Sequence, residues 1–253
     1  MLIQQTRNFV KTRGFTLIEL AIVLVIIGVL VGSFIGTIGA RIDTTRRVET
    51  IDSLEEIKQT ILGYAYSSTG PNLPCPDCTS ACTGGTPNDG IEDRNSGACS
   101  AGSNVGNLPW ITLGLGVSDV WHTRYRYWAD PVFADDGTVS GVTFTLTDNA
   151  SGTILTRSPD GSSTPTLATN VVMVIFSHGK NTYGGTSSEG DARPAIPVAN
   201  TDESENTDSN AVFVSRSPSG PEATTAGGEF DDILLWMSEY ELKARMVEIG
   251  RLP

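Results

Sequence analysis

A run of 26 residues, 15–40, contains one charged side chain, Glu19, and consists otherwise mostly of Leu, Ile, Val and Gly. As an α-helix rising about 1.5 Å per residue, the run would extend about 39 Å, which exceeds the ~30 Å hydrocarbon core of a bilayer. A charge inside such a helix costs several kcal/mol and is usually paired. The run is therefore predicted to span a membrane, and Glu19 is expected to have a partner.

Charge divides the chain into a basic start and an acidic remainder. Residues 1–14 contain Arg7, Lys11 and Arg13 and no acidic residue, whereas the whole chain has 17 basic and 29 acidic residues and a formal net charge of −12. Positive residues stay on the cytoplasmic side of a membrane helix, so the acidic part is expected across the membrane. The acidity argues against nucleic-acid binding, which relies on Lys and Arg.

Two ordinary roles fit the apolar run poorly. A secretory signal peptide needs an apolar run of only about 7–15 residues followed by a small-residue cleavage site. A plain single-pass anchor fits the length and the basic flank but gives Glu19 no partner. A third role has to explain both the length and the carboxylate.

The string RGFTLIEL at residues 13–20, at the end of a short basic leader that stops at Gly14, resembles the processing site of type IV pilins and type II secretion pseudopilins. The resemblance implies that prepilin peptidase cuts after Gly14 and methylates the new α-amine of Phe15. It also implies that Glu19, then fifth in the mature chain, pairs with the amine of a neighbouring subunit as helices pack into a filament.

The remaining sequence predicts an α+β fold. Beyond the apolar run, apolar residues recur at spacings of three and four and indicate an amphipathic helix that ends near a Gly-Pro pair at 70–71. Together with the resemblance, this predicts a long N-terminal helix packed on an antiparallel β-sheet head with long loops. The expected parts are the leader 1–14, the transmembrane and filament-core helix 15–40, its amphipathic continuation 41–69, and a periplasmic head 70–253.

The head is expected to contain short strands and long turns. Alternation predicts a hairpin arm at 141–147, and a continuous apolar run at 170–176 predicts a central strand covered on both faces. A weaker strand is expected at 211–216. The polar segment 187–210 is expected to be a mobile acidic loop. Acidic residues followed by basic ones predict a C-terminal helix at about 231–249.

Four cysteines lie in the segment 75–99: Cys75, Cys78, Cys82 and Cys99. In a reducing cytosol this cluster could hold zinc or an iron–sulfur cluster. If the basic leader stays inside, however, the cysteines face an oxidising compartment, where an even number favours two disulfides. Three connectivities are possible, and the sequence does not choose among them.

Few residues in the sequence are candidates for metal binding or catalysis. Asp89, Glu92 and Asp93 supply the oxygen ligands that calcium prefers, although acidic turns are common on solvated surfaces; no other cofactor is expected. His122 and His178 are the two histidines, and no hydrolase, P-loop or dinucleotide motif accompanies them. The sequence therefore predicts a protein that is not an enzyme.

Aromatic residues concentrate in 108–128, which includes Trp110, Trp121 and Trp128. We interpret them first as core residues with a cation–π contact from Arg124 or Arg126, and second as a surface for a glycan or partner protein.

The resemblance implies a subunit of a type IV pilus or secretion pseudopilus, and the size of the chain favours a minor subunit. Its implied partners are other pilin or pseudopilin subunits, prepilin peptidase and the inner-membrane assembly platform. It would reside in the bacterial inner membrane as a single-pass protein with a periplasmic head and then enter the filament. The alternatives are a membrane-anchored or pilus-borne adhesin and, third, an anchored periplasmic enzyme.

Overall fold

The computed structural model describes residues 14–67, 70–100, 105–139, 141, 143–158, 160–221 and 226–252, without the side chains of 33–38 and 40. The predicted leader, apart from Gly14, lies outside the described residues. The chain divides into two compact units, 1–45 and 46–253.

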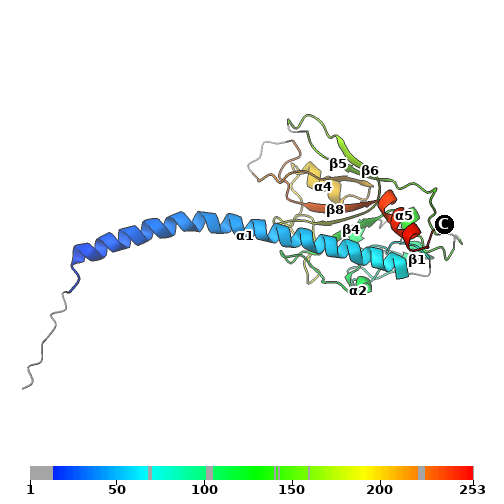
Figure 1. Ribbon diagram of the computed structural model, residues 1–253, viewed down its shortest axis with the longest axis horizontal. Helices are drawn as coiled ribbons and strands as arrows, with labels where there is room; N and C mark the ends of the chain where they lie inside the picture. Colours follow the sequence, from blue (N-terminus) through cyan, green and yellow to red (C-terminus); the bar gives the residue numbers. More distant parts are fainter. Residues whose placement is uncertain are drawn as a thin grey trace, which may run out of the picture. The chain divides into compact units, whose positions relative to one another are not determined.

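One helix, α1 (Leu17–Ser67), follows three non-helical residues, Gly14 to Thr16 (Figure 1). It confirms the predicted long N-terminal helix and the predicted stop before Gly70. In the first unit, the described side chains of α1 are exposed or, at Asp43, half-buried.

In the second unit, α1 packs one face against the head. Leu54, Ile57, Ile61 and Ala65 are buried at helical spacing and join the larger of two hydrophobic clusters. Val48 and Ile51, apolar residues that precede this buried face in α1, are exposed.

The head is built around a six-stranded sheet in the order β3-β4-β6-β5-β7, with β8 also paired to β6. Its strands are β3 (Val105–Asn107), β4 (Arg126–Ala129), β5 (Gly152–Leu155), β6 (Thr166–Ser177), β7 (Val212–Val214) and β8 (Ile233–Ser238), and β1 (Arg94–Asn95) pairs separately with β2 (Ala98–Cys99). The short helices are α2 (Trp110–Leu113), α3 (Pro131–Ala134), α4 (Thr201–Thr207) and α5 (Glu239–Glu248).

The sheet is covered on both faces, as the apolar run of β6 predicts. Met173 and Ile175 belong to the cluster that includes α1, whereas Val174 and Phe176 belong to a second cluster with Trp128 and other residues. Successive side chains of a strand point to opposite faces, so a strand buried on both sides must be apolar throughout.

The sheet is mixed, which corrects the expectation of an antiparallel head. β5 and β7 pair in parallel, while the other named pairs are antiparallel. Parallel strands need a long crossover, and here the chain between β5 and β7 contains β6 and α4.

The predicted hairpin arm at 141–147 is wrong. The described residues there form bends and turns, because Asp148 accepts hydrogen bonds from the backbone N–H and the hydroxyl of Thr145 at 2.6 and 2.9 Å. Local side-chain bonds of this kind compete with a strand ladder. Phe144 is nevertheless buried, 4.8 Å from the ring of Phe133.

The predicted C-terminal helix begins too early. Residues 233–238 form β8, paired with β6, and Ser238 then caps α5 by accepting a hydrogen bond from the N–H of Glu241. The apolar run 233–237 finds a strand partner, and this tertiary pairing overrides the helical pattern. Figure 1 shows β8 and α5 in succession near the C-terminal end of the chain.

The polar segment 187–210 is also more ordered than predicted, because α4 occupies part of it. Asp202, Glu203 and Asn206 of α4 are buried. The side-chain amide of Asn206 bonds both the C=O and the N–H of Val214, at 3.1 and 2.7 Å. Asn206 therefore satisfies backbone groups of β7, at the end of the sheet.

Candidate functional site

The start of α1 is closed by a reciprocal cap between Thr16 and Glu19. The backbone N–H and the hydroxyl of Thr16 both donate to Glu19 Oε2 at 2.9 Å, and the N–H of Glu19 donates to Thr16 Oγ1 at 3.3 Å. This is a capping box, in which two side chains satisfy N–H groups that the helix leaves unpaired. It holds the carboxylate of Glu19 against the first turn.

The peptide bond between Gly14 and Phe15 lies outside the helix and is accessible. Phe15 is 86% exposed, and among the described residues no atom outside the immediate neighbours of Gly14 lies within 4 Å of the place where a side chain on Gly14 would begin. A peptidase needs an accessible, non-helical bond, and this junction supplies one. Glu19 is also exposed, and its Oε1 accepts no hydrogen bond from the residues that the structure describes.

The four cysteines form two disulfides, which confirms the disulfide prediction and selects one connectivity. Cys75 pairs with Cys99, and Cys78 pairs with Cys82. The buried carboxylate of Asp93 supports the smaller loop, because it accepts from the N–H of Cys78 at 2.7 Å and of Thr86 at 3.1 Å.

The other two predicted calcium ligands, Glu92 and Asp89, also accept hydrogen bonds from donors of the chain itself. Glu92 accepts from the hydroxyl of Tyr64 at 2.6 Å, the N–H of Cys75 and the guanidinium of Arg94, and Asp89 accepts from the N–H of Ile91. Asp89, Glu92 and Asp93 do not converge as a ligand group in the part of the chain that the structure describes. Calcium binding by them stays a prediction.

The aromatic segment is divided between core and surface. Trp128 is buried, Trp121 is half-buried against the core, and the guanidinium of Arg124 lies 4.4 Å from the ring centroid of Trp110. This agrees with the interpretation of core residues with a cation–π contact.

The two histidines are far from equivalent. His122 is exposed, whereas His178 is buried directly after β6. Burial and the nearby Arg126 guanidinium lower the pKa of His178 to about 3, so its ring is neutral at physiological pH.

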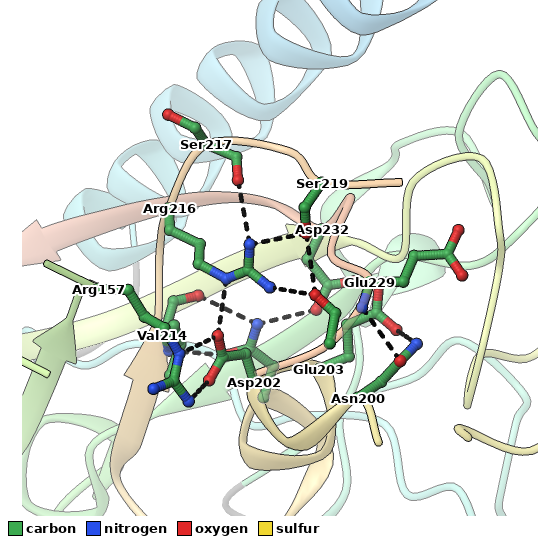
Figure 2. Close-up of polar contacts among 12 residues, drawn as sticks. Arg157, Asn200, Asp202, Glu203, Val214, Arg216, Ser217, Ser219, Glu229 and Asp232 are labelled. Atoms are coloured by element: carbon green, nitrogen blue, oxygen red, sulfur yellow. Dashed lines mark hydrogen bonds and ion pairs between the residues drawn. The ribbon is translucent and has the colours of Figure 1, made fainter. Parts of the chain in front are cut away.

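A buried ionic cluster around α4 was not predicted from the sequence. Asp202 accepts two hydrogen bonds from Arg157, at 2.7 and 2.5 Å, and one from Arg216 at 2.7 Å (Figure 2). Arg216 also donates to the C=O of Gly228 and lies over the ring of Phe230. Asp202 thus joins three segments that are distant in the sequence, and no local pattern could have indicated this.

The decisive comparison concerns the first helix. The family model described as the prokaryotic N-terminal methylation motif matches residues 10–35, which include the accessible Gly14–Phe15 bond and the Thr16–Glu19 cap. The chain carries a prepilin-type signal. This signal is the one found in type IV pilins and pseudopilins, and it marks the chain as a pilin-like substrate of prepilin peptidase.

The prepilin-type signal occupies only the N-terminal part of the chain. A search of curated proteins and a search of solved structures found no match. Within the residues that the structure describes, no helix combines the length and the apolar character needed to cross a membrane.

Proposed function

We propose that this protein is a minor structural subunit of a type IV pilus or a type II secretion pseudopilus. It is inserted in the bacterial inner membrane with its head in the periplasm, cleaved between Gly14 and Phe15, methylated at Phe15 and assembled through α1. The observation that carries the proposal is the prepilin-type signal on an accessible bond just before a capped helix.

The cap geometry supports the proposed role of Glu19 in assembly. Cleavage would give Phe15 a positively charged amine, and among the described residues Glu19 Oε1 accepts no hydrogen bond while Oε2 holds the helix start. A neighbouring subunit's amine could therefore bind Glu19 without opening the cap. Leaving either charge unpaired in an apolar setting would cost about 3–5 kcal/mol, which makes correct pairing a condition for stacking.

The cleavage step can be tested with two glycine variants of the full chain, expressed in membranes with prepilin peptidase. Gly14→Val places a branched side chain at the cleavage point, and we expect the precursor to remain uncut. Gly28→Val is the matched control, because it adds the same side chain within α1 at a position with open space around it. Normal removal of the leader from the Gly14→Val variant would contradict the proposed site.

The assembly step is tested separately with Glu19→Ala and Glu19→Gln. Both variants should insert and lose the leader, but their amount in sheared filaments should fall at least about tenfold, since about 1.4 kcal/mol per subunit contact already changes an equilibrium tenfold. Wild-type levels of both variants in filaments would contradict the proposed pairing of Glu19 with a neighbouring subunit's amine.

A further inference from the structure

Three carboxyl groups meet where α4 approaches the start of β8. They belong to Glu203, Asp231 and Asp232, and one oxygen of each lies within 4.8 Å of the others. Glu203 is 1% exposed and Asp232 is 3% exposed. We call these three residues the carboxyl triad; Figure 2 shows Glu203 and Asp232 beside the Asp202 cluster.

Neutral side chains hold the triad in place. Glu203 accepts hydrogen bonds from the amides of Asn181 and Asn200, at 2.7 and 3.0 Å, and from the N–H of Asp231 at 3.2 Å. Asp231 Oδ2 accepts from the N–H of Asn181 at 2.9 Å, while its Oδ1 is buried without a hydrogen-bond partner among the described residues.

Asp232 has a similarly incomplete environment. Its Oδ2 accepts from the amide of Asn206 at 2.8 Å, whereas its Oδ1 lies 4.0 Å from Nδ1 of His178, which is neutral. Among the described residues, no lysine or arginine forms an ion pair with a triad carboxylate. The triad therefore consists of two buried acids and one half-buried acid, and among the described residues no ion pair with lysine or arginine compensates them.

Charged and titratable groups also surround the triad. They include Arg47 on α1, His178 and Lys180 after β6, Arg216 after β7 and Glu229 before β8. Arg47 and Arg216 favour ionised carboxylates from a distance, whereas Glu229 opposes ionisation.

The effect of burial on the pKa values of the triad is larger than the effect of the two arginines. Burial raises the pKa of Asp231 to about 7 and that of Asp232 well above the ordinary value, and the neighbouring Glu203 carboxylate raises both further. Burial also raises the pKa of Glu203. Three carboxylates this close cannot all ionise cheaply, so the site retains protons at neutral pH.

We propose that Glu203, Asp231 and Asp232 form a proton-dependent latch between α4 and β8. In the closed state, at least one triad carboxyl group is protonated, so that the three oxygens within 4.8 Å of one another do not all carry charge. Release of that proton to solvent leaves mutually repelling buried charges, which loosens the segment 229–232 from α4. This inference does not depend on the proposed function.

A divalent cation is the competing occupant, and the surroundings favour protons. Calcium takes six to eight oxygen ligands. The amide oxygens of Asn181, Asn200 and Asn206 already accept hydrogen bonds from the N–H groups of Tyr183, Glu229 and Val214. These three amide oxygens are therefore engaged by the chain's own N–H groups in the described structure, which disfavours their use as calcium ligands.

The latch predicts lower stability at alkaline pH. A carboxyl group whose pKa is raised in the folded state contributes stability that is fully present below its ordinary pKa of 3.8 and is lost as pH rises through the folded pKa, about 7 for Asp231. In the full chain in detergent micelles, the exchange protection of the Asn181 and Asp231 amides, corrected for intrinsic rate, should fall about tenfold or more between about pH 6 and about pH 9. Unchanged protection would overturn the latch.

Variants of the triad test whether these three residues cause the pH dependence of exchange protection. Asp232→Asn mimics the protonated acid and should flatten the pH dependence, as should Glu203→Gln in part. Asp52→Asn, which changes an exposed carboxylate on α1, is the control and should retain it. Equal pH dependence in Asp232→Asn and the wild type would contradict the proposal.

Infrared spectroscopy reads the proton directly and needs only the wild-type chain, should Asp232→Asn fail to fold. The carbonyl band of a protonated carboxylic acid should be present at about pH 6 and should weaken as pH rises through about 7, where Asp231 and also Asp77 of the disulfide loop lose their protons. Absence of that band at the lower pH would overturn the proposal. Loss of the band on addition of calcium chloride, with a rise in Tm, would replace the proton latch with a cation site.

Discussion

Glu19 serves two purposes with one carboxylate. Its Oε2 closes the capping box with Thr16, and its Oε1 is left free among the described residues. The sequence predicted the importance of Glu19 from its charge in an apolar run and from the resemblance. It did not predict the cap, although the Thr-x-x-Glu spacing before an apolar run is a recognised signal for one.

The contribution of the Thr16 hydroxyl to the cap can be measured without changing the charge of Glu19. Replacing Thr16 by Ala removes the hydroxyl from the capping box and should weaken the helix start by about 1 kcal/mol. Amide exchange at Glu19 and Leu20 should become faster, while Thr16→Ser keeps a hydroxyl and should behave like the wild type. Unchanged exchange in Thr16→Ala would show that the cap contributes nothing to the helix start.

Asp202 is the residue on which the arginine contacts of the head converge. Its side chain is 3% exposed, and the side chains of Arg157 and Arg216 are 17% and 7% exposed. Replacing Asp202 by Ala leaves two guanidinium groups without their carboxylate and should lower the free energy of unfolding by about 3–5 kcal/mol. Thermal unfolding of the full chain measures this, with exposed Asp208→Ala as the control. Equal Tm values for the two variants would contradict the assignment.

At the scale of elements, α1 and β6 could be predicted because their own residues show the pattern that burial imposes: helical spacing in α1 and a continuous apolar run in β6. β8 was missed because its own residues do not distinguish a strand from a helix. Its run 233–237 is apolar between acidic and helical segments, and only its pairing with β6, some 60 residues away, makes it a strand. The parallel pairing of β5 with β7 likewise depends on a path through β6 and α4 that no local signal specifies.

The two disulfides constrain loops of different length. Cys75–Cys99 spans 24 positions and Cys78–Cys82 spans four. In the chain-entropy account, removing the first should cost about 3.5 kcal/mol and removing the second about 2 kcal/mol. Paired Cys→Ser variants compared by thermal unfolding should therefore show the larger loss of Tm for the 75–99 bridge. The reverse order would show that contacts of the small loop, such as those of Asp93, dominate.

At the scale of the whole molecule, the prepilin-type signal and the buried polar clusters lie in different parts of the chain. The prepilin-type signal covers residues 10–35, and its key residues could be predicted because they are contiguous. The head's buried polar clusters could not, because they join positions far apart: Lys58 of α1 pairs with Glu241 of α5, and Glu203 meets Asp231 and Asp232. Such groupings exist only after folding.

The central claim is that processing creates a charged amine at Phe15. Mass spectrometry of the protein isolated from bacterial membranes, with fragmentation of its N-terminal peptide, tests this most directly. The account predicts a chain that begins at Phe15 and carries a methyl group on its α-amine. A chain that still begins at Met1, or that begins beyond Ala40, would contradict it.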